Sequence, residues 1–361
     1  MNHKVIQLSS KARNLALDTG LGIADALSNV LDEHVEQLRE IDFDEQELQQ
    51  ELIQKLSGFS FLQPLLDDEA VEEIWINKPG EVRFARNGVH QVTDVSFSGQ
   101  ELQTLVERMI RQTGRRLDRS MPFIDAELGS GYRLHAVIPD ITRKHMSLNI
   151  RKFSNRVLTA ETLLAGGVLS EPQLKYLLDR LSAGANLMIS GATQAGKTTL
   201  LSALLSALKP EERVVSVEDT FELRCLLPDW VALQTRPPST DGRLEVDLRR
   251  LVRETLRMRP TRLVVGEVRG AEALDMLIAM NSGIPGMCTI HANSADEALN
   301  KLKTLPLLAG GNISSVFLDS VIRGSLDLFV HCQRNTDGSR KLASIKTISA
   351  NAALQLEEVL L

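Results

Sequence analysis

The feature that most constrains the fold is one stretch, Asn186 to Leu208, which joins a short apolar run, a loop of small residues and a leucine-rich helical pattern. Its sequence is NLMISGATQAGKTTLLSALLSAL, in which Gly191, Gly196, Lys197 and Thr198 match the pattern G-x-x-x-x-G-K-[ST]. A strand, a glycine loop and a helix in this order direct loop amides and the helix N-terminus at a phosphate group. The stretch therefore predicts a phosphate loop between a buried strand and a helix.

The pattern of apolar and polar residues around this loop predicts an α/β protein with more than one domain. From about Val168 to the end, apolar runs alternate with helical segments, which predicts a largely parallel sheet covered on both faces. Residues 59–153 show strand alternation, turn pairs at Pro79-Gly80 and Asn87-Gly88, and one helix, as expected of a smaller α+β domain. Residues 154–167 are expected to be a connector, and residues 1–58 an N-terminal helical extension.

Composition excludes several classes of protein. The net charge is −6, with acidic and basic residues mixed, which argues against a protein built mainly to bind nucleic acid. The three cysteines are far apart, so neither a disulfide framework nor a C-x-x-C metal site is expected. The N-terminal residues lack the apolar core of a signal peptide, and no apolar run is long enough to span a membrane. These features predict a cytoplasmic protein that reaches the membrane through partners.

The phosphate loop carries the predicted nucleotide contacts. Lys197 is expected to reach the β- and γ-phosphates, and the hydroxyl of Thr198 to bind Mg²⁺. Gly191 and Gly196 would let the backbone approach the phosphates without a Cβ between them. The predicted ATP-binding residues are Gly191, Ala192, Thr193, Gln194, Ala195, Gly196, Lys197, Thr198 and Thr199.

Acidic groups and a histidine follow three other predicted strands. The run RLVVGEVRG holds an apolar strand that ends in Glu267, and the aspartate that many phosphate-loop proteins have one position earlier is here Gly266. The run VVSVEDTFEL places the three carboxylates of Glu218, Asp219 and Glu222 together, and the strand in MCTIHANS ends in His291. Each could by itself be a solvated loop residue or a structural histidine. Because parallel strands end at one edge of a sheet, we expect these groups to lie beside the phosphate loop, with Glu267 acting on the metal directly or through water.

Several longer segments resemble one family of proteins. The stretch from QTRPPSTDGR to TIHANSADEAL closely resembles the secretion-superfamily ATPases, especially the tight-adherence (Flp/Tad-type) pilus assembly ATPases. VEDTFEL is similar to the family's Asp box, VVGEVRGAEALDML to its Walker B segment and TIHANS to its His box. EEIWINKPGEVRF, GRRLDRSMPFIDAEL, YRLHAVIPD and NIRKF, in the smaller domain, are also similar to the family. The resemblance implies a RecA-like ATPase domain and covers about Phe59 to the C-terminus.

The resemblance also implies roles for single residues. Glu222 matches the glutamate that orients or deprotonates the attacking water, Glu267 the Walker B glutamate, and His291 the histidine that senses the γ-phosphate. Arg133 and Arg151 match arginines that reach a nucleotide in this superfamily. One departure is the loop GATQAGKTT, where family members read close to GGTGSGKTT.

The function implied is a hexameric ATPase that works on an inner-membrane platform to assemble a pilus or to secrete. Three alternatives remain open from the sequence: an ATPase of the type IV secretion or conjugation kind, a DNA translocase suggested by the arginine-rich DLRRLVRETLRMR, and a nucleotide-gated scaffold suggested by the unusual loop. In that arginine-rich helix the interleaved acids favour ion pairs over nucleic-acid contact. The implied ligands are ATP and Mg²⁺.

Overall fold

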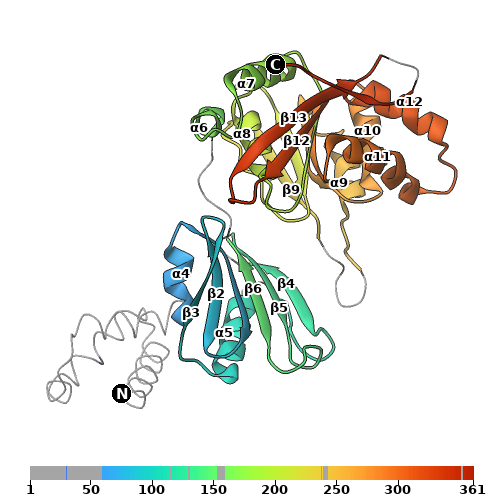
Figure 1. Ribbon diagram of the computed structural model, residues 1–361. Coiled ribbons are helices and arrows are strands. Elements are labelled where there is room, and N and C mark those ends of the chain that lie inside the picture. Colours follow the sequence, from blue (N-terminus) through green and yellow to red (C-terminus); the bar gives the residue numbers. More distant parts are fainter. Residues whose placement is uncertain are drawn as a thin grey trace. The chain divides into compact units, whose positions relative to one another are not determined.

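The computed structural model divides the chain into two compact units, Met1–Ser154 and Asn155–Leu361, each with its own sheet and core (Figure 1). Besides Val30, which is buried in a helix, the residues that the structure describes are 59–111, 113, 115–128, 131–152, 159–236, 238, 243–350 and 353–361. The predicted helical extension over 1–58 otherwise lies outside the described residues. No described helix has the length and apolar character needed to cross a membrane.

The first unit is built on an antiparallel sheet of six strands in the order β3-β2-β1-β6-β5-β4. Side chains alternate along these strands, so that Leu134 and Ile150 join α5 in one hydrophobic core while their neighbours lie on the open face. The described elements are η1 (Ser60–Leu62), α4 (Gln63–Asp67), β1 (Val71–Lys78), β2 (Glu81–Arg86), β3 (Val89–Asp94), α5 (Gly99–Arg111), β4 (Phe123–Glu127), β5 (Arg133–Val137) and β6 (Ser147–Arg151).

The second unit is built on an eight-stranded sheet in the order β14-β13-β12-β7-β11-β10-β8-β9. The six strands from β12 to β9 in this order are parallel, and β13 and β14 add antiparallel pairs at one edge. The strands are β7 (Leu187–Gly191), β8 (Val214–Glu218), β9 (Trp230–Gln234), β10 (Arg262–Val268), β11 (Gly286–His291), β12 (Leu328–Arg334), β13 (Arg340–Ile348) and β14 (Leu356–Glu358).

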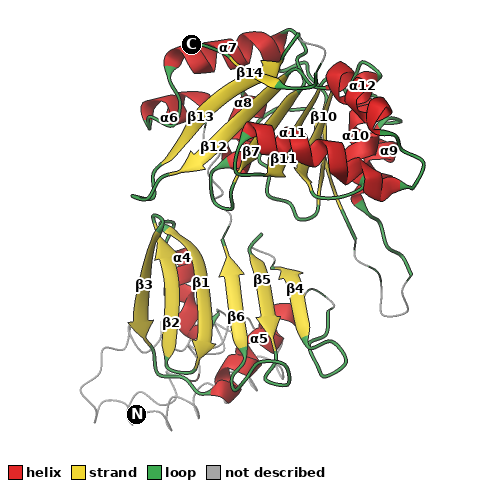
Figure 2. Ribbon diagram, turned by 45° about the vertical axis from the view of Figure 1, so that its right-hand side comes forward, coloured by secondary structure: helices red, strands yellow, loops and turns green. Residues whose placement is uncertain are grey.

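Helices cover both faces of this sheet, as Figure 2 shows. They are α6 (Ala160–Ala165), α7 (Glu171–Ser182), α8 (Lys197–Ser206), α9 (Leu248–Thr255), α10 (Glu272–Asn281), α11 (Ala295–Thr304), η2 (Leu305–Ala309) and α12 (Ser315–Ser325). Leu187 and Ile189 of β7 pack with α7 and α8, while Met188 between them packs on the opposite face with α10 and α12. The predicted α/β fold with a largely parallel, doubly covered sheet is confirmed.

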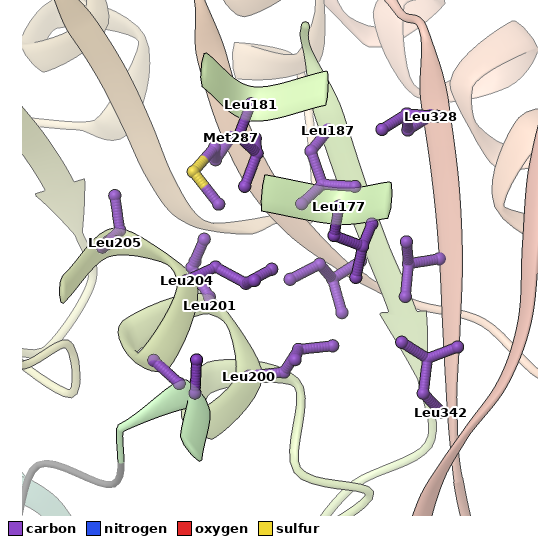
Figure 3. Close-up of a cluster of buried hydrophobic side chains, with 14 of the residues drawn as sticks. Leu177, Leu181, Leu187, Leu200, Leu201, Leu204, Leu205, Met287, Leu328 and Leu342 are labelled. Carbon is purple, nitrogen blue, oxygen red and sulfur yellow. The ribbon is translucent and has the colours of Figure 1, made fainter. Parts of the chain in front are cut away.

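The core between α7, α8 and the sheet is a dense cluster of leucines (Figure 3). Leu200, Leu201 and Leu204 of α8 are buried there, which fixes the helix that follows the phosphate loop. α6 lies within the stretch expected to be a connector. Its Ala160 and Leu163 are buried in this same cluster, so this helix belongs to the core of the second unit.

Candidate functional site

The predicted phosphate loop connects the end of β7 to the start of α8. Gly196 precedes α8 with φ at 90°, and Gln194 also has a positive φ of 62°. A Cβ at Gly191 would lie 2.6 Å from the carbonyl oxygen of Cys332 on β12, so glycine is required where the two strands meet. No side chain caps the first turn of α8, so the amide N–H groups at this helix N-terminus can donate hydrogen bonds to a bound anion.

Lys197 is buried against the loop that precedes it. Its ammonium group donates to the carbonyl oxygens of Gly191 and Ala192, both at 3.1 Å, and lies 3.5 Å from Nδ1 of His291. Around it, Thr198 is half-buried in the first turn of α8, whereas Ala192, Thr193 and Thr199 are exposed and Ala195 is buried. The loop residues named from the sequence therefore surround the start of α8.

Two arginines from the β12–β13 hairpin hold the loop at Gln194, a contact that the sequence did not predict. Arg334 donates to the side-chain oxygen of Gln194 at 2.7 Å, and Arg340 donates to its main-chain carbonyl oxygen at 2.9 Å. Gln194 is one of the residues by which this loop departs from the family pattern. The departure has a structural role, because its side chain fixes the loop to a neighbouring strand.

The structure brings the predicted Glu267 and His291 together with Lys197. His291 lies opposite Gly191 in the register of β11 and β7, and Glu267 lies on the next strand, β10. Nε2 of His291 is 3.1 Å from Oε1 of Glu267, although the two atoms are not aligned for a hydrogen bond. Since Lys197 can only donate, Nδ1 of His291 is the acceptor, and the neutral imidazole carries its proton on Nε2, beside the carboxylate.

Arg269 extends this cluster to β8 and was not predicted from the sequence. It donates to Oε2 of Glu267 at 2.6 Å and lies 3.6 Å from Oδ2 of Asp219. Burial by itself would raise the pKa of Glu267, but the hydrogen bond and charge of Arg269, aided by His291 and Lys197, lower it overall. Burial and the nearby Lys197 lower the pKa of His291. The ionised carboxylate and the neutral imidazole are thus both favoured.

Glu218, at the end of β8, is the most buried carboxylate of the cluster. Its Oε2 accepts hydrogen bonds from the amides of Glu222 and Leu223, at 2.7 and 2.8 Å, while its Oε1 is buried without a hydrogen-bond partner. Burial raises the pKa of Glu218 to about 7. A Cβ at Gly266 would lie 2.8 Å from Cγ of Glu218, so Glu218 fills the space that a side chain at 266 would need.

Glu222, the predicted water-orienting glutamate, lies directly after this turn. Its backbone is fixed by Glu218, its side chain is half-buried, and its charge contributes to the raised pKa of Glu218. The structure therefore places Glu222 in the same carboxylate cluster as Glu218, at the edge of the sheet where β7, β8, β10 and β11 end.

The donor set fits Mg²⁺ held together with a substrate. Within the described part of the chain, no three His, Cys, Asp or Glu side chains form a ready metal cage. Mg²⁺ usually takes only one or two protein carboxylates, with waters and substrate phosphates completing its shell. The partnerless Oε1 of Glu218, the ionised Glu267 and the hydroxyl of Thr198 are oxygen donors of the kind that this ion prefers.

The two predicted arginines lie in the first unit. Arg133 begins β5 and Arg151 ends β6, and they are direct cross-strand partners, which puts both side chains on the same face of the sheet. That face is the open one, because Leu134 and Ile150 next to them point into the core. Arg133 lies 3.6 Å from Asp125.

The arginine-rich helix α9 is largely occupied by ion pairs. Arg249 and Arg253 both bind the carboxylate of Asp275 on α10 at 2.7 Å, and Arg257 binds Glu254 at 2.9 Å. The three arginines are ion-paired as expected, but only Arg257, just beyond the end of α9, uses one of the interleaved acids; the partner of Arg249 and Arg253 is Asp275 on α10. A DNA-binding face would need arginines that are available to phosphates.

Known proteins agree with this architecture. Residues 55–357 match the family model described as "Type II/IV secretion system protein". A Mycobacterium tuberculosis relative, named provisionally as a conjugal transfer protein, is 34% identical over 81% of this chain and 85% of its own length. The type IV secretion system protein PtlH of Bordetella pertussis is 32% identical over 78% of this chain and 91% of its own length.

Among solved structures, the Legionella pneumophila ATPase DotB is similar in fold, with a TM-score of 0.58 at 18% identity over 79% of each chain. The family match spans both units and contains the phosphate loop and the three strand ends described above. The chain therefore belongs to the type II/IV secretion system protein family.

Proposed function

We propose that this chain hydrolyses ATP to drive a secretion machine of the type IV secretion or conjugal transfer kind. The observation that carries the proposal is the cluster of Lys197, His291 and Glu267, which joins the phosphate loop to two neighbouring strand ends. Charge that builds up on a transferred phosphoryl group is stabilised by groups fixed in advance around it. The proposal is supported by relatives of this chain that are named as conjugal transfer and type IV secretion system proteins.

Each residue has a distinct part in the proposal. The α8 amides and Lys197 bind the phosphates of ATP, and Thr198 with Glu267 holds Mg²⁺, which neutralises phosphate charge when bound. Glu222 orients the attacking water, and His291 responds to the γ-phosphate from beside Lys197. The amides of Glu222 and Leu223 are held by Glu218, so the position of the Glu222 backbone is set before ATP binds.

Two substitutions test the hydrolytic part of the proposal. Lys197→Ala should abolish ATP hydrolysis, and Glu222→Gln should retain bound ATP while turnover falls. The measurements are phosphate release at saturating Mg-ATP and the nucleotide content of the purified protein. Near wild-type hydrolysis by both variants would refute the proposed mechanism. Tight ATP binding with no turnover by the unmodified oligomer would instead support the nucleotide-gated scaffold.

Pilus assembly of the tight-adherence kind is a second candidate. It is favoured by the Walker B and His box segments, which are similar to those of the tight-adherence ATPases. The genes beside this one discriminate between the candidates, because prepilin and prepilin peptidase genes indicate a pilus, whereas mating-channel genes indicate conjugal transfer. Under either candidate the partner is an inner-membrane platform protein, and the chain works on the cytoplasmic side.

A closed ring, as in a hexamer, is part of the same proposal. Arg133 and Arg151 share one face of the first unit, and we propose that they complete the ATP site of a neighbouring subunit. Mass measurement with and without a non-hydrolysable ATP analogue tests this. A strict monomer under both conditions contradicts the ring, and normal hydrolysis by Arg133→Ala with Arg151→Ala contradicts the role of the arginines.

A further inference from the structure

Two loops of the first unit form a basic surface that the proposed ATP site does not use. They are residues 115–122, before β4, and residues 138–146, after β5, and together we call them the basic loop pair. The amide of Ile138 donates to the carbonyl oxygen of Pro122 at 2.9 Å, and Arg119 binds Asp140 at 2.8 Å. The loops therefore lie side by side at one end of the sheet (Figure 2).

This end of the sheet is opposite to the one that carries Arg133 and Arg151. Phe123, at the start of β4, pairs with Val137, at the end of β5, next to the basic loop pair. At the other end of the same strands, Glu127 pairs with Arg133. Residues on the basic loop pair can thus be changed without touching the arginines proposed to reach ATP.

The basic loop pair is positive on a chain whose net charge is −6. Its acidic residues are Asp118 and Asp140, and both are engaged locally. Asp118 accepts hydrogen bonds from Ser120 and from the amide of Met121, and Asp140 binds Arg119. The exposed basic side chains are Arg115, Arg116, Arg119, Arg143 and Lys144.

Large apolar side chains are exposed among these charges. Met121 is 48% exposed, Phe123 54% and Ile141 55%, one from each loop and one from the strand start between them. Methionine, phenylalanine and isoleucine side chains gain free energy on transfer from water to hydrocarbon. Basic residues interleaved with exposed apolar ones are typical of surfaces that lie in the headgroup region of a membrane.

We propose that the basic loop pair binds the surface of an anionic phospholipid bilayer directly. The basic side chains would contact headgroup phosphates, and Met121, Phe123 and Ile141 would enter the boundary between headgroups and acyl chains. This contact needs no membrane-spanning helix and no partner protein, and it goes beyond the proposed ATPase function. It would hold the chain against the leaflet in which a secretion platform is embedded.

The test uses the full chain and sedimentation with vesicles of phosphatidylcholine alone or with one third phosphatidylglycerol. The protein should bind the anionic vesicles, bind the neutral ones weakly, and be released by salt. Each basic residue near an anionic surface is worth about fivefold in partitioning, so Arg143→Glu with Lys144→Glu should weaken binding by at least about 25-fold. Met121→Ser with Ile141→Ser, which keeps the charge, should weaken it severalfold.

Lys175→Glu with Lys209→Glu is the matched control, because it makes the same charge change at exposed lysines of the second unit. It should leave vesicle binding unchanged. Hydrolysis of ATP without lipid should be unaffected in all these variants, so a failure of lipid binding is distinguished from a failure of the proposed ATPase. If the charge-reversal variant does not fold, the serine variant and the salt dependence decide.

Three outcomes would overturn the proposal. The first is that anionic vesicles do not bind the wild-type chain, and the second is that the loop variants and the lysine control bind equally well. The third is binding to a DNA duplex, but not to vesicles, that is lost in Arg143→Glu with Lys144→Glu. That result would assign the surface to nucleic acid.

Discussion

Replacing the buried Glu218 with glutamine should change how the stability of the second unit depends on pH. Burial raises the pKa of Glu218 to about 7, against an ordinary value of 4.5. Between these pH values the folded chain holds a proton that the unfolded chain has released. Because the folded state then binds more protons, the free energy of unfolding falls as the pH rises from 4.5 to 7 and is level above that.

The size of the effect follows from the same two values. The interval from 4.5 to about 7, at about 1.4 kcal/mol per pH unit, gives a cost of about 3 kcal/mol at pH 8. Glutamine keeps an oxygen that can accept from the amides of Glu222 and Leu223, but it cannot ionise. Glu218→Gln should therefore be more stable than the wild type at pH 8, by up to about 3 kcal/mol, and the two should converge as the pH falls below 4.5.

Urea unfolding followed by tryptophan fluorescence measures this difference locally. Trp230 donates to Oγ of Ser216 at 2.9 Å, two residues from Glu218 on β8, and the other tryptophan of the chain is Trp75. A Trp75→Phe background, without Mg²⁺ or nucleotide, leaves Trp230 as the reporter. Glu211→Gln, at an exposed position, is the control. If Glu218→Gln and the wild type showed the same dependence of the free energy of unfolding on pH, or if Glu218→Gln were the less stable of the two at pH 8, burial would not be what raises the pKa of Glu218.

Two further predictions concern the phosphate loop. Gly191→Ala should lower the free energy of unfolding by about 1–3 kcal/mol, because the new Cβ would lie 2.6 Å from the carbonyl oxygen of Cys332. Gly310→Ala, which meets nothing within 4 Å, should change it little, and equal effects of the two substitutions would contradict the prediction. Gln194→Gly and Arg334→Gln should show a coupling energy of about 1–2 kcal/mol in a double-mutant cycle, since each removes the same charge-assisted hydrogen bond. Gln194→Gly with Arg340→Gln should be nearly additive, since Arg340 bonds the main chain; coupling of equal size in both cycles would argue against the specific contact.

The sequence predicted the fold well where burial gives a strong pattern. The runs that became β7, β8, β10 and β11 are mostly apolar and buried at nearly every position, because parallel strands inside a covered sheet bury both faces. β13 was not predicted. It lies near the sheet edge, and its buried Leu342 and Ile345 are separated by two residues and flanked by Lys341 and Lys346, so its pattern is weak.

The candidate site was predictable where it depends on local order along the chain. A glycine loop between a strand and a helix, and polar groups after strands, follow from spacing alone. The contacts of Gln194 with Arg334 and Arg340 were not predictable, because those residues are about 140 positions away and meet it only through strand register. The depth of Glu218 is likewise set by the missing side chain of Gly266 on the adjacent strand.

Gly266 also explains how two carboxylates of one site acquire different properties. Without a side chain at 266, Glu218 extends from β8 into the interior, where burial favours its protonated form. Glu267 follows on β10 but faces Arg269, which favours its ionised form. Environments that push two pKa values apart are how sites divide acid and base roles among identical side chains. At neutral pH Glu267 therefore keeps its negative charge, whereas the carboxyl of Glu218 can either keep or release a proton.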